Sequence, residues 1–175
     1  METKEFLIAA SVNNKVAVLN KITAAFLKRH INIESLNVSE SHIEGISTMV
    51  ITSVMTEETM RLLIAHLDSL FDVVHVACYN PEDIVNIELA LYKISTQEDS
   101  EENRTLLRNI NGSVIEHNDD YIILEKSGSR VLLENIRLTL EKQNMLLDYS
   151  RSGNVVLHKD PLENFYDVAR LSMAI

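Results

Sequence analysis

The sequence predicts an α+β protein made of two successive βαββαβ units, the order found in ferredoxin-like domains. Residues 6–12 form the first expected strand, and the helix after it places four apolar residues on one face at three- and four-residue spacing: Val16, Leu19, Ile22 and Phe26. After His30 the period changes to two, as Ile31 and Ile33 alternate with polar neighbours. Pro81 then interrupts the pattern, because proline cannot donate to a strand ladder.

The first half of the chain completes one such unit. Gly45 lies in a turn expected at residues 41–47, and a strand is expected at 49–51. Thr56 is a suitable N-cap for a second helix. Its predicted inward face consists of Met60, Leu63, Ile64, Leu67, Leu70 and Phe71. A strand at 73–77 closes the unit, so we expect a first domain over residues 1–79.

The second half repeats this order with a different sequence. After a strand at 85–94, a helix is expected to carry acidic residues in its first turns, where the helix dipole favours carboxylates: Glu98, Asp99, Glu101 and Glu102. Gly112 marks the end of this helix. A hairpin over 113–125, a helix with Leu133, Ile136 and Leu140 inward, and strands at 145–149 and 155–157 follow. The second domain is expected at 80–159, with a tail at 160–175.

Composition excludes several classes of function. The 175 residues carry a formal charge of −10, which disfavours binding to nucleic acid and to anionic membranes, and there is no Trp for base stacking. No segment has the length of a membrane span, and the first residues lack the features of a signal peptide. The lone Cys78 cannot form an internal disulfide. A cytoplasmic location is therefore expected.

The turn between the first strand and the first helix, residues 13–19, is the best candidate binding site. Free N–H groups at the start of a helix can hold a carboxylate, and the Asn14 amide offers both a donor and an acceptor. Val18 and Leu19 are placed to line a pocket for an aliphatic side chain. The alternative is that Asn13 and Asn14 simply form a turn, since asparagine tolerates left-handed backbone geometry.

Other polar clusters indicate no catalytic or metal site. The run from Glu116 to Asp120 is oxygen-rich, but it lacks the glycine and the distant bidentate glutamate of a calcium loop, so a solvated turn is expected. His75 and Cys78 have no third group to complete a nucleophilic set. Arg151 suits either a subunit contact or a solvated strand end. We therefore expect neither catalytic residues nor a bound metal.

Three blocks in the same order resemble one family. They are Asn32-Ile33-Glu34-Ser35-Leu36 after a strand-turn-helix with Asn14 at the turn, Glu88-Leu89-Ala90-Leu91-Tyr92-Lys93-Ile94, and Arg151-Ser152-Gly153 followed by Val155-Val156-Leu157. The chain resembles the small subunit of acetohydroxyacid synthase (acetolactate synthase), whose first domain is an ACT domain. The resemblance implies a non-catalytic regulatory subunit of branched-chain amino-acid synthesis. Its partner is a large catalytic subunit that holds thiamine diphosphate, Mg²⁺ and FAD.

The resemblance also implies an effector site between the two chains of a homodimer, with valine as the usual effector. One chain supplies Asn14, Ala17, Val18 and Leu19, and its partner supplies Asn32 and Ile33. The family usually has Gly where this chain has Ala17, and glycine serves where the backbone approaches a ligand or adopts a positive φ. Because of Ala17, an activator without a ligand is an alternative. A free-standing amino-acid sensor, which needs the same turn but no large subunit, is another.

Overall fold

The computed structural model describes residues 2–97 and 100–160. Contacts divide these residues into two units, which are described separately: residues 2–86 together with 154–160, and residues 87–153. Each unit is an antiparallel sheet with two helices, so the predicted pair of ferredoxin-like α+β units is confirmed.

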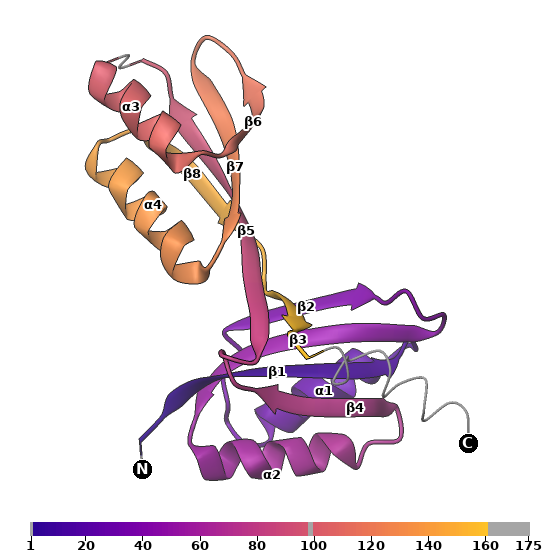
Figure 1. Ribbon diagram of the computed structural model, residues 1–175. Coiled ribbons are helices and arrows are strands. Elements are labelled where there is room, and N and C mark those ends of the chain that lie inside the picture. Colours follow the sequence, from indigo (N-terminus) through magenta and orange to yellow (C-terminus); the bar gives the residue numbers. More distant parts are fainter. Residues whose placement is uncertain (1, 98–99, 161–175) are drawn as a thin grey trace. The chain divides into compact units, whose positions relative to one another are not determined.

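The first unit contains a four-stranded sheet in the order β2-β3-β1-β4, with α1 and α2 against one face (Figure 1). Its elements are β1 (Lys4–Asn13), α1 (Val18–Leu27), β2 (Ser35–Glu40), β3 (Ile46–Met55), α2 (Glu57–Asp68) and β4 (Val73–Tyr79). Alternate residues of β1, such as Ile8, pack with Phe26 of α1 and Leu63 of α2 in one buried cluster. The strand period of two and the helical period therefore converge on a single core.

The other face of this sheet is also partly covered. Ala9 and Val50 are buried there, and Val156 of β9 (Val155–His158) packs against them. The ring of Tyr79 meets that of His158 edge to face, with centroids 5.6 Å apart. β9 pairs with β5, and the segment 154–160 belongs to the first unit.

The second unit has its own sheet, in the order β6-β7-β5-β8, with α3 and α4 against one face (Figure 1). Its elements are β5 (Ile84–Ser95), whose first residues belong to the first unit, α3 (Glu101–Ile110), β6 (Ser113–His117), β7 (Tyr121–Gly128), α4 (Arg130–Lys142) and β8 (Leu146–Arg151). The core includes Tyr92, Ile94, Leu133 and Leu140. The predicted inward face of α4 is confirmed, since Leu133, Ile136 and Leu140 are all buried.

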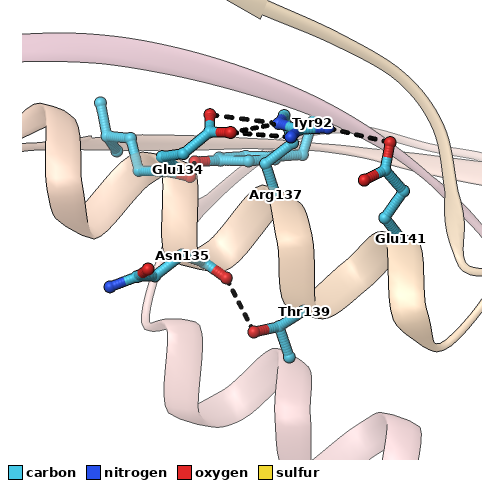
Figure 2. Close-up of polar contacts among 7 residues, drawn as sticks. Tyr92, Glu134, Asn135, Arg137, Thr139 and Glu141 are labelled. Carbon is cyan, nitrogen blue, oxygen red and sulfur yellow. Dashed lines mark hydrogen bonds and ion pairs between the residues drawn. The ribbon is translucent and has the colours of Figure 1, made fainter.

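A hydrogen bond from β5 holds α4 to this core, and ion pairs within the helix stabilise it further. The buried Tyr92 hydroxyl donates to the Leu133 carbonyl at 2.8 Å. Figure 2 shows Arg137 between Glu134 and Glu141, with Nη2–Oε1 at 2.7 Å and Nη1–Oε1 at 2.9 Å respectively. The hydrogen bond from Arg137 holds the pKa of Glu134 below its usual value.

Arg151 has a role that the sequence did not predict. Its guanidinium pairs with the carboxylate of Glu88, which is only 3% exposed. A buried carboxylate needs a partner, because removing one member of such a pair leaves an uncompensated charge. In this chain Arg151 is therefore part of an internal ion pair rather than a solvated strand end.

Two predicted helix faces are partly wrong. Val16 is 99% exposed, and Leu19 is also exposed, because Ala17 adopts a left-handed conformation and α1 begins only at Val18. The helical spacing therefore starts at Val18. The buried face of α1 consists of Val18, Ile22, Ala25 and Phe26. Phe71 is 91% exposed because α2 ends at Asp68. The predicted N-cap is confirmed, since Thr56 accepts from the Thr59 N–H.

Some predicted boundaries also differ. β2 begins at Ser35, so residues 31–34 lead into the strand rather than forming it. α3 ends at Ile110 with Asn111 as its left-handed C-cap, one residue before Gly112, where the end was expected. Contacts group residues 80–86 and 154–160 with the first unit, and the division into domains at 1–79 and 80–159 stays a prediction. Glu98, Asp99 and the tail from 161 lie outside the described residues.

Candidate functional site

The start of α1 differs from that of the other helices in the described residues. α2, α3 and α4 are each capped by a hydroxyl, from Thr56, Ser100 and Ser129 respectively. α1 has Ala17 at this position, with no side-chain cap and no acidic residue in its first turn. The first N–H groups of a helix have no intrahelical acceptor, and the dipole makes this end positive. The start of α1 can therefore accept an anionic group.

Backbone contacts hold the turn before α1 in place. The Asn13 N–H donates to the Asp72 carbonyl at 2.8 Å, and the Asn14 N–H donates to the Gly45 carbonyl at 2.8 Å. Lys21 of α1 then reaches the Asp72 carboxylate, with Nζ–Oδ2 at 2.6 Å. This hydrogen bond lowers the pKa of Asp72, against the opposing effect of burial. Two neighbouring loops and α1 thus fix the turn.

The Asn14 side chain contacts a residue that sequence reasoning missed. Its Nδ2 donates to Glu40 Oε1 at 2.9 Å, and both residues are exposed. The strand register brings them together, since Glu40 pairs with Ser47 and Asn13 pairs with the adjacent Ile46. Glu40 is 26 residues from Asn14, and no local pattern in the sequence points to it. The turn therefore carries a carboxylate beside its amide.

The other predicted residues of the turn divide between surface and core. Ala17 is exposed at φ 72°, a left-handed conformation that disfavours residues with a Cβ. Leu19 is exposed as well. Val18 is only 3% exposed and belongs to the core with Ile22, so its side chain is not available to line a pocket in this chain.

Asn32 and Ile33 lie just before β2. The Asn32 side chain is exposed and donates through Nδ2 to Glu34 Oε1 at 2.8 Å, while its carbonyl accepts from the Ser53 hydroxyl. Ile33 is half-buried against the first core. These contacts fix the backbone of the segment and leave the Asn32 amide at the surface.

The two halves of the predicted site are far apart in one chain. Ser35 pairs with Thr52, and Thr52 pairs with Leu7, so β2 begins level with Leu7, with β3 between the two strands. Asn13 lies six residues further along β1. At a rise of about 3.3 Å per residue, these six residues alone span about 20 Å, so Asn14 and Asn32 lie at opposite ends of the sheet. A small molecule cannot contact both in a single chain.

Comparisons with known proteins identify the family. Residues 8–75 match the model for "AHAS small subunit-like ACT domain", and residues 87–160 match that for "Small subunit of acetolactate synthase". The Bacillus subtilis acetolactate synthase small subunit is 30% identical over 149 residues, 84% of this chain and 86% of that protein. The chain belongs to the acetolactate synthase small-subunit family.

Other small subunits are similar to this one over most of its length. A probable acetolactate synthase small subunit from Methanothermobacter thermautotrophicus is 29% identical over 91% of this chain and 95% of that protein. The crystal structure of the Thermotoga maritima small subunit superposes with a TM-score of 0.81 at 30% identity, covering 90% of this chain and 98% of that one. The predicted resemblance is confirmed, and the first unit contains an ACT domain.

Membership in the family sets the class of function. The chain is a regulatory small subunit and not the catalytic subunit, and a small subunit of this type implies a large catalytic partner. No helix in residues 2–97 and 100–160 is long and apolar enough to cross a membrane.

Proposed function

We propose that this small subunit activates a large acetolactate synthase subunit and transmits feedback inhibition by valine. Valine would bind between two copies of the chain, at the start of α1 of one copy and at residues 32–33 of the other. The observation that carries this proposal is the start of α1, which is uncapped, firmly held and exposed at Asn14. The ACT domain, residues 1–79 in our division, would be the effector-binding domain.

The position of β2 supports a homodimer. β2 is the edge strand of the first sheet in the order β2-β3-β1-β4, so one of its sides has no strand partner among the described residues. Two edge strands that pair antiparallel around a two-fold axis bring the start of each beside the end of the other. Asn32 of one copy would then approach Glu40 and Asn14 of the second. This arrangement removes the separation between Asn14 and Asn32 that exists within one chain.

The residues at the turn match the chemistry of a small α-amino acid. The N–H groups at the start of α1 suit its carboxylate. Glu40 and the carbonyl oxygen of the Asn14 amide suit its ammonium group. Leu19 and the partner copy's Ile33 would contact an aliphatic side chain. The binding groups would therefore come from both copies.

Ala17 favours a second candidate, an activator that binds no ligand. Its Cβ stands at the exposed start of α1, where the family usually has glycine, and would narrow the space for a carboxylate. This candidate keeps the partnership with the large subunit and removes only the response to valine.

The expected mechanism is linkage between two sites. The large subunit would hold thiamine diphosphate, Mg²⁺ and FAD and carry out the reaction in the cytoplasm, and this chain would favour its active state. Valine inhibits only if it binds the less active state better, with a coupling typically of about 1–3 kcal/mol.

Acetolactate formation by the cognate large subunit tests the proposal. It is measured with and without this chain across a valine titration. Activation together with valine inhibition supports the proposal. Activation without inhibition favours the ligand-free activator, and no activation contradicts the regulatory role.

A further inference from the structure

A buried asparagine ties the returning segment of the chain to β2 and β3. Asn154 is only 5% exposed, and its Nδ2 donates to Thr52 Oγ1 at 2.9 Å. Its carbonyl accepts from Asn37 Nδ2 of β2 at 3.1 Å. Buried polar groups with satisfied hydrogen bonds fix a unique arrangement, because breaking one of these bonds leaves its partner without compensation.

This contact lies next to the start of β2, where we place half of the effector site. The Thr52 carbonyl accepts from the Glu34 N–H at 2.9 Å, and the neighbouring Ser53 donates its hydroxyl to the Asn32 carbonyl. Asn154 therefore contacts the same short stretch of β3 that fixes the backbone around Asn32. A shift of that backbone on ligand binding would reach Thr52 first and then Asn154.

Two residues earlier, the chain is held equally firmly by the second unit. The Ser152 N–H donates to the Leu89 carbonyl at 2.8 Å, and the Leu89 N–H donates to Ser152 Oγ at 2.9 Å. The preceding residue, Arg151, pairs with the buried Glu88. Residues 151 and 152 are thus fixed to β5, whereas Asn154 is fixed to the first sheet. Gly153 is the single residue between these two attachments.

We propose that Asn154 is a positioning residue that couples the effector site on β2 to the second unit through the one-residue link at Gly153. The coupling rests on the proposed function, because it supposes an effector at residues 32–33. A link of one residue has almost no slack, so a displacement at Thr52 and Asn37 is passed to Ser152 and β5. A longer link would absorb the same displacement, since each added residue spans up to about 3.5 Å.

Two variants of the full chain test this coupling. The first is Asn154→Ala, which removes the side-chain bond to Thr52. The second inserts two glycines after Gly153, which leaves the hydrogen bonds on both sides intact and adds only slack. The same insertion between Asp119 and Asp120, in the exposed β6–β7 turn, is the matched control. Valine binding is measured by calorimetry, folding by thermal melting, and inhibition by acetolactate formation with the large subunit.

The coupling predicts wild-type valine affinity and wild-type activation for the variant with the insertion after Gly153, together with loss of inhibition. The factor by which valine binding shifts the large subunit toward its less active state falls toward one. In linked sites this factor is typically about 5- to 150-fold. The control insertion keeps full inhibition. If Asn154→Ala folds, it also loses valine inhibition. If it does not fold, the variant with the insertion after Gly153 is the test of the coupling.

Three other outcomes contradict the coupling. Wild-type inhibition in the variant with the insertion after Gly153 overturns the coupling and leaves the proposed function standing. Loss of valine binding in that variant shows that the link shapes the site itself, which also overturns the coupling. Absence of inhibition in the wild-type protein overturns the valine response, and the coupling with it.

Discussion

Lys21 Nζ lies 2.6 Å from Asp72 Oδ2, at the end of the first sheet where α1 begins. The Asp72 carbonyl also accepts the Asn13 N–H, so this residue holds the turn with its side chain and with its backbone. The Lys21 ammonium lowers the pKa of Asp72 in the folded chain, whereas the unfolded chain has the ordinary value of 3.8.

We predict that Lys21→Met lowers the melting temperature at neutral pH by removing the partner of Asp72. A carboxyl with a lowered pKa stabilises the fold above its unfolded pKa, and this contribution is lost as pH falls through the folded pKa. The difference in melting temperature between wild type and variant should therefore be constant above about pH 5 and close progressively at lower pH. Lys28→Met, a change at the exposed C-cap of the same helix, is the control. A gap that persists in strong acid would contradict this role for the ion pair.

The buried face of the first helix could be predicted only in part from the sequence. Val16 and Leu19 fit an apolar face by spacing, but a single left-handed residue at Ala17 resets the start of the helix. No rule of periodicity places a positive φ at an alanine. In α4 a serine cap precedes an uninterrupted helix, and there the predicted inward residues are correct.

The site shows the same division between local and long-range information. The turn and Asn14 could be named from local sequence, because turn chemistry is local. The contacts of Asn14 with Glu40, of Arg151 with Glu88 and of Asn154 with Thr52 could not, since only the tertiary fold brings these distant residues together. The separation of Asn14 from Asn32 likewise follows only from the register of three strands.

Ala17→Gly should raise the free energy of unfolding by about 1 kcal/mol. A Cβ in the left-handed region is strained, and glycine relieves this strain despite its greater freedom in the unfolded chain. The melting temperature should rise by about 2–4 °C in thermal unfolding. Ala24→Gly, inside α1, should instead lower stability by about 1 kcal/mol. A loss of stability in Ala17→Gly would show that the alanine is not strained.

Removing the hydroxyl should change stability differently at two tyrosines of the second unit, because one hydroxyl is hydrogen-bonded and the other is not. The rings of Tyr92 and Tyr149 pack with centroids 5.2 Å apart. The Tyr92 hydroxyl donates to Leu133, whereas the buried Tyr149 hydroxyl has no hydrogen-bond partner among the described residues. Tyr92→Phe should cost about 1 kcal/mol, and Tyr149→Phe should be neutral or stabilising. Equal losses in denaturant unfolding would contradict this difference.

Gly112→Ala should destabilise the second unit more than Gly45→Ala destabilises the first. A Cβ on Gly112 would lie 2.6 Å from the Glu125 carbonyl oxygen and 2.5 Å from Leu124 Cδ2. Gly45 has open space around it, so alanine there is strained only by the positive φ. This strain costs about 1 kcal/mol. Hydrogen exchange would locate each loss in its own unit. A larger loss for Gly45→Ala would contradict the steric argument.

Mixing two defective small subunits tests most directly whether valine binds between copies. Asn14→Ala and Asn32→Ala should each abolish valine inhibition of acetolactate formation and leave activation largely intact. The exposed Asn135→Ala is the matched control and should change neither.

When the two defective variants are unfolded together and refolded as a mixture, each mixed dimer has one site with both asparagines intact. The measurement is acetolactate formation by the large subunit with this mixture across a valine titration. We predict partial recovery of inhibition, which neither variant shows alone. No recovery, with mixed dimers confirmed by mass spectrometry, would contradict a site shared between two copies.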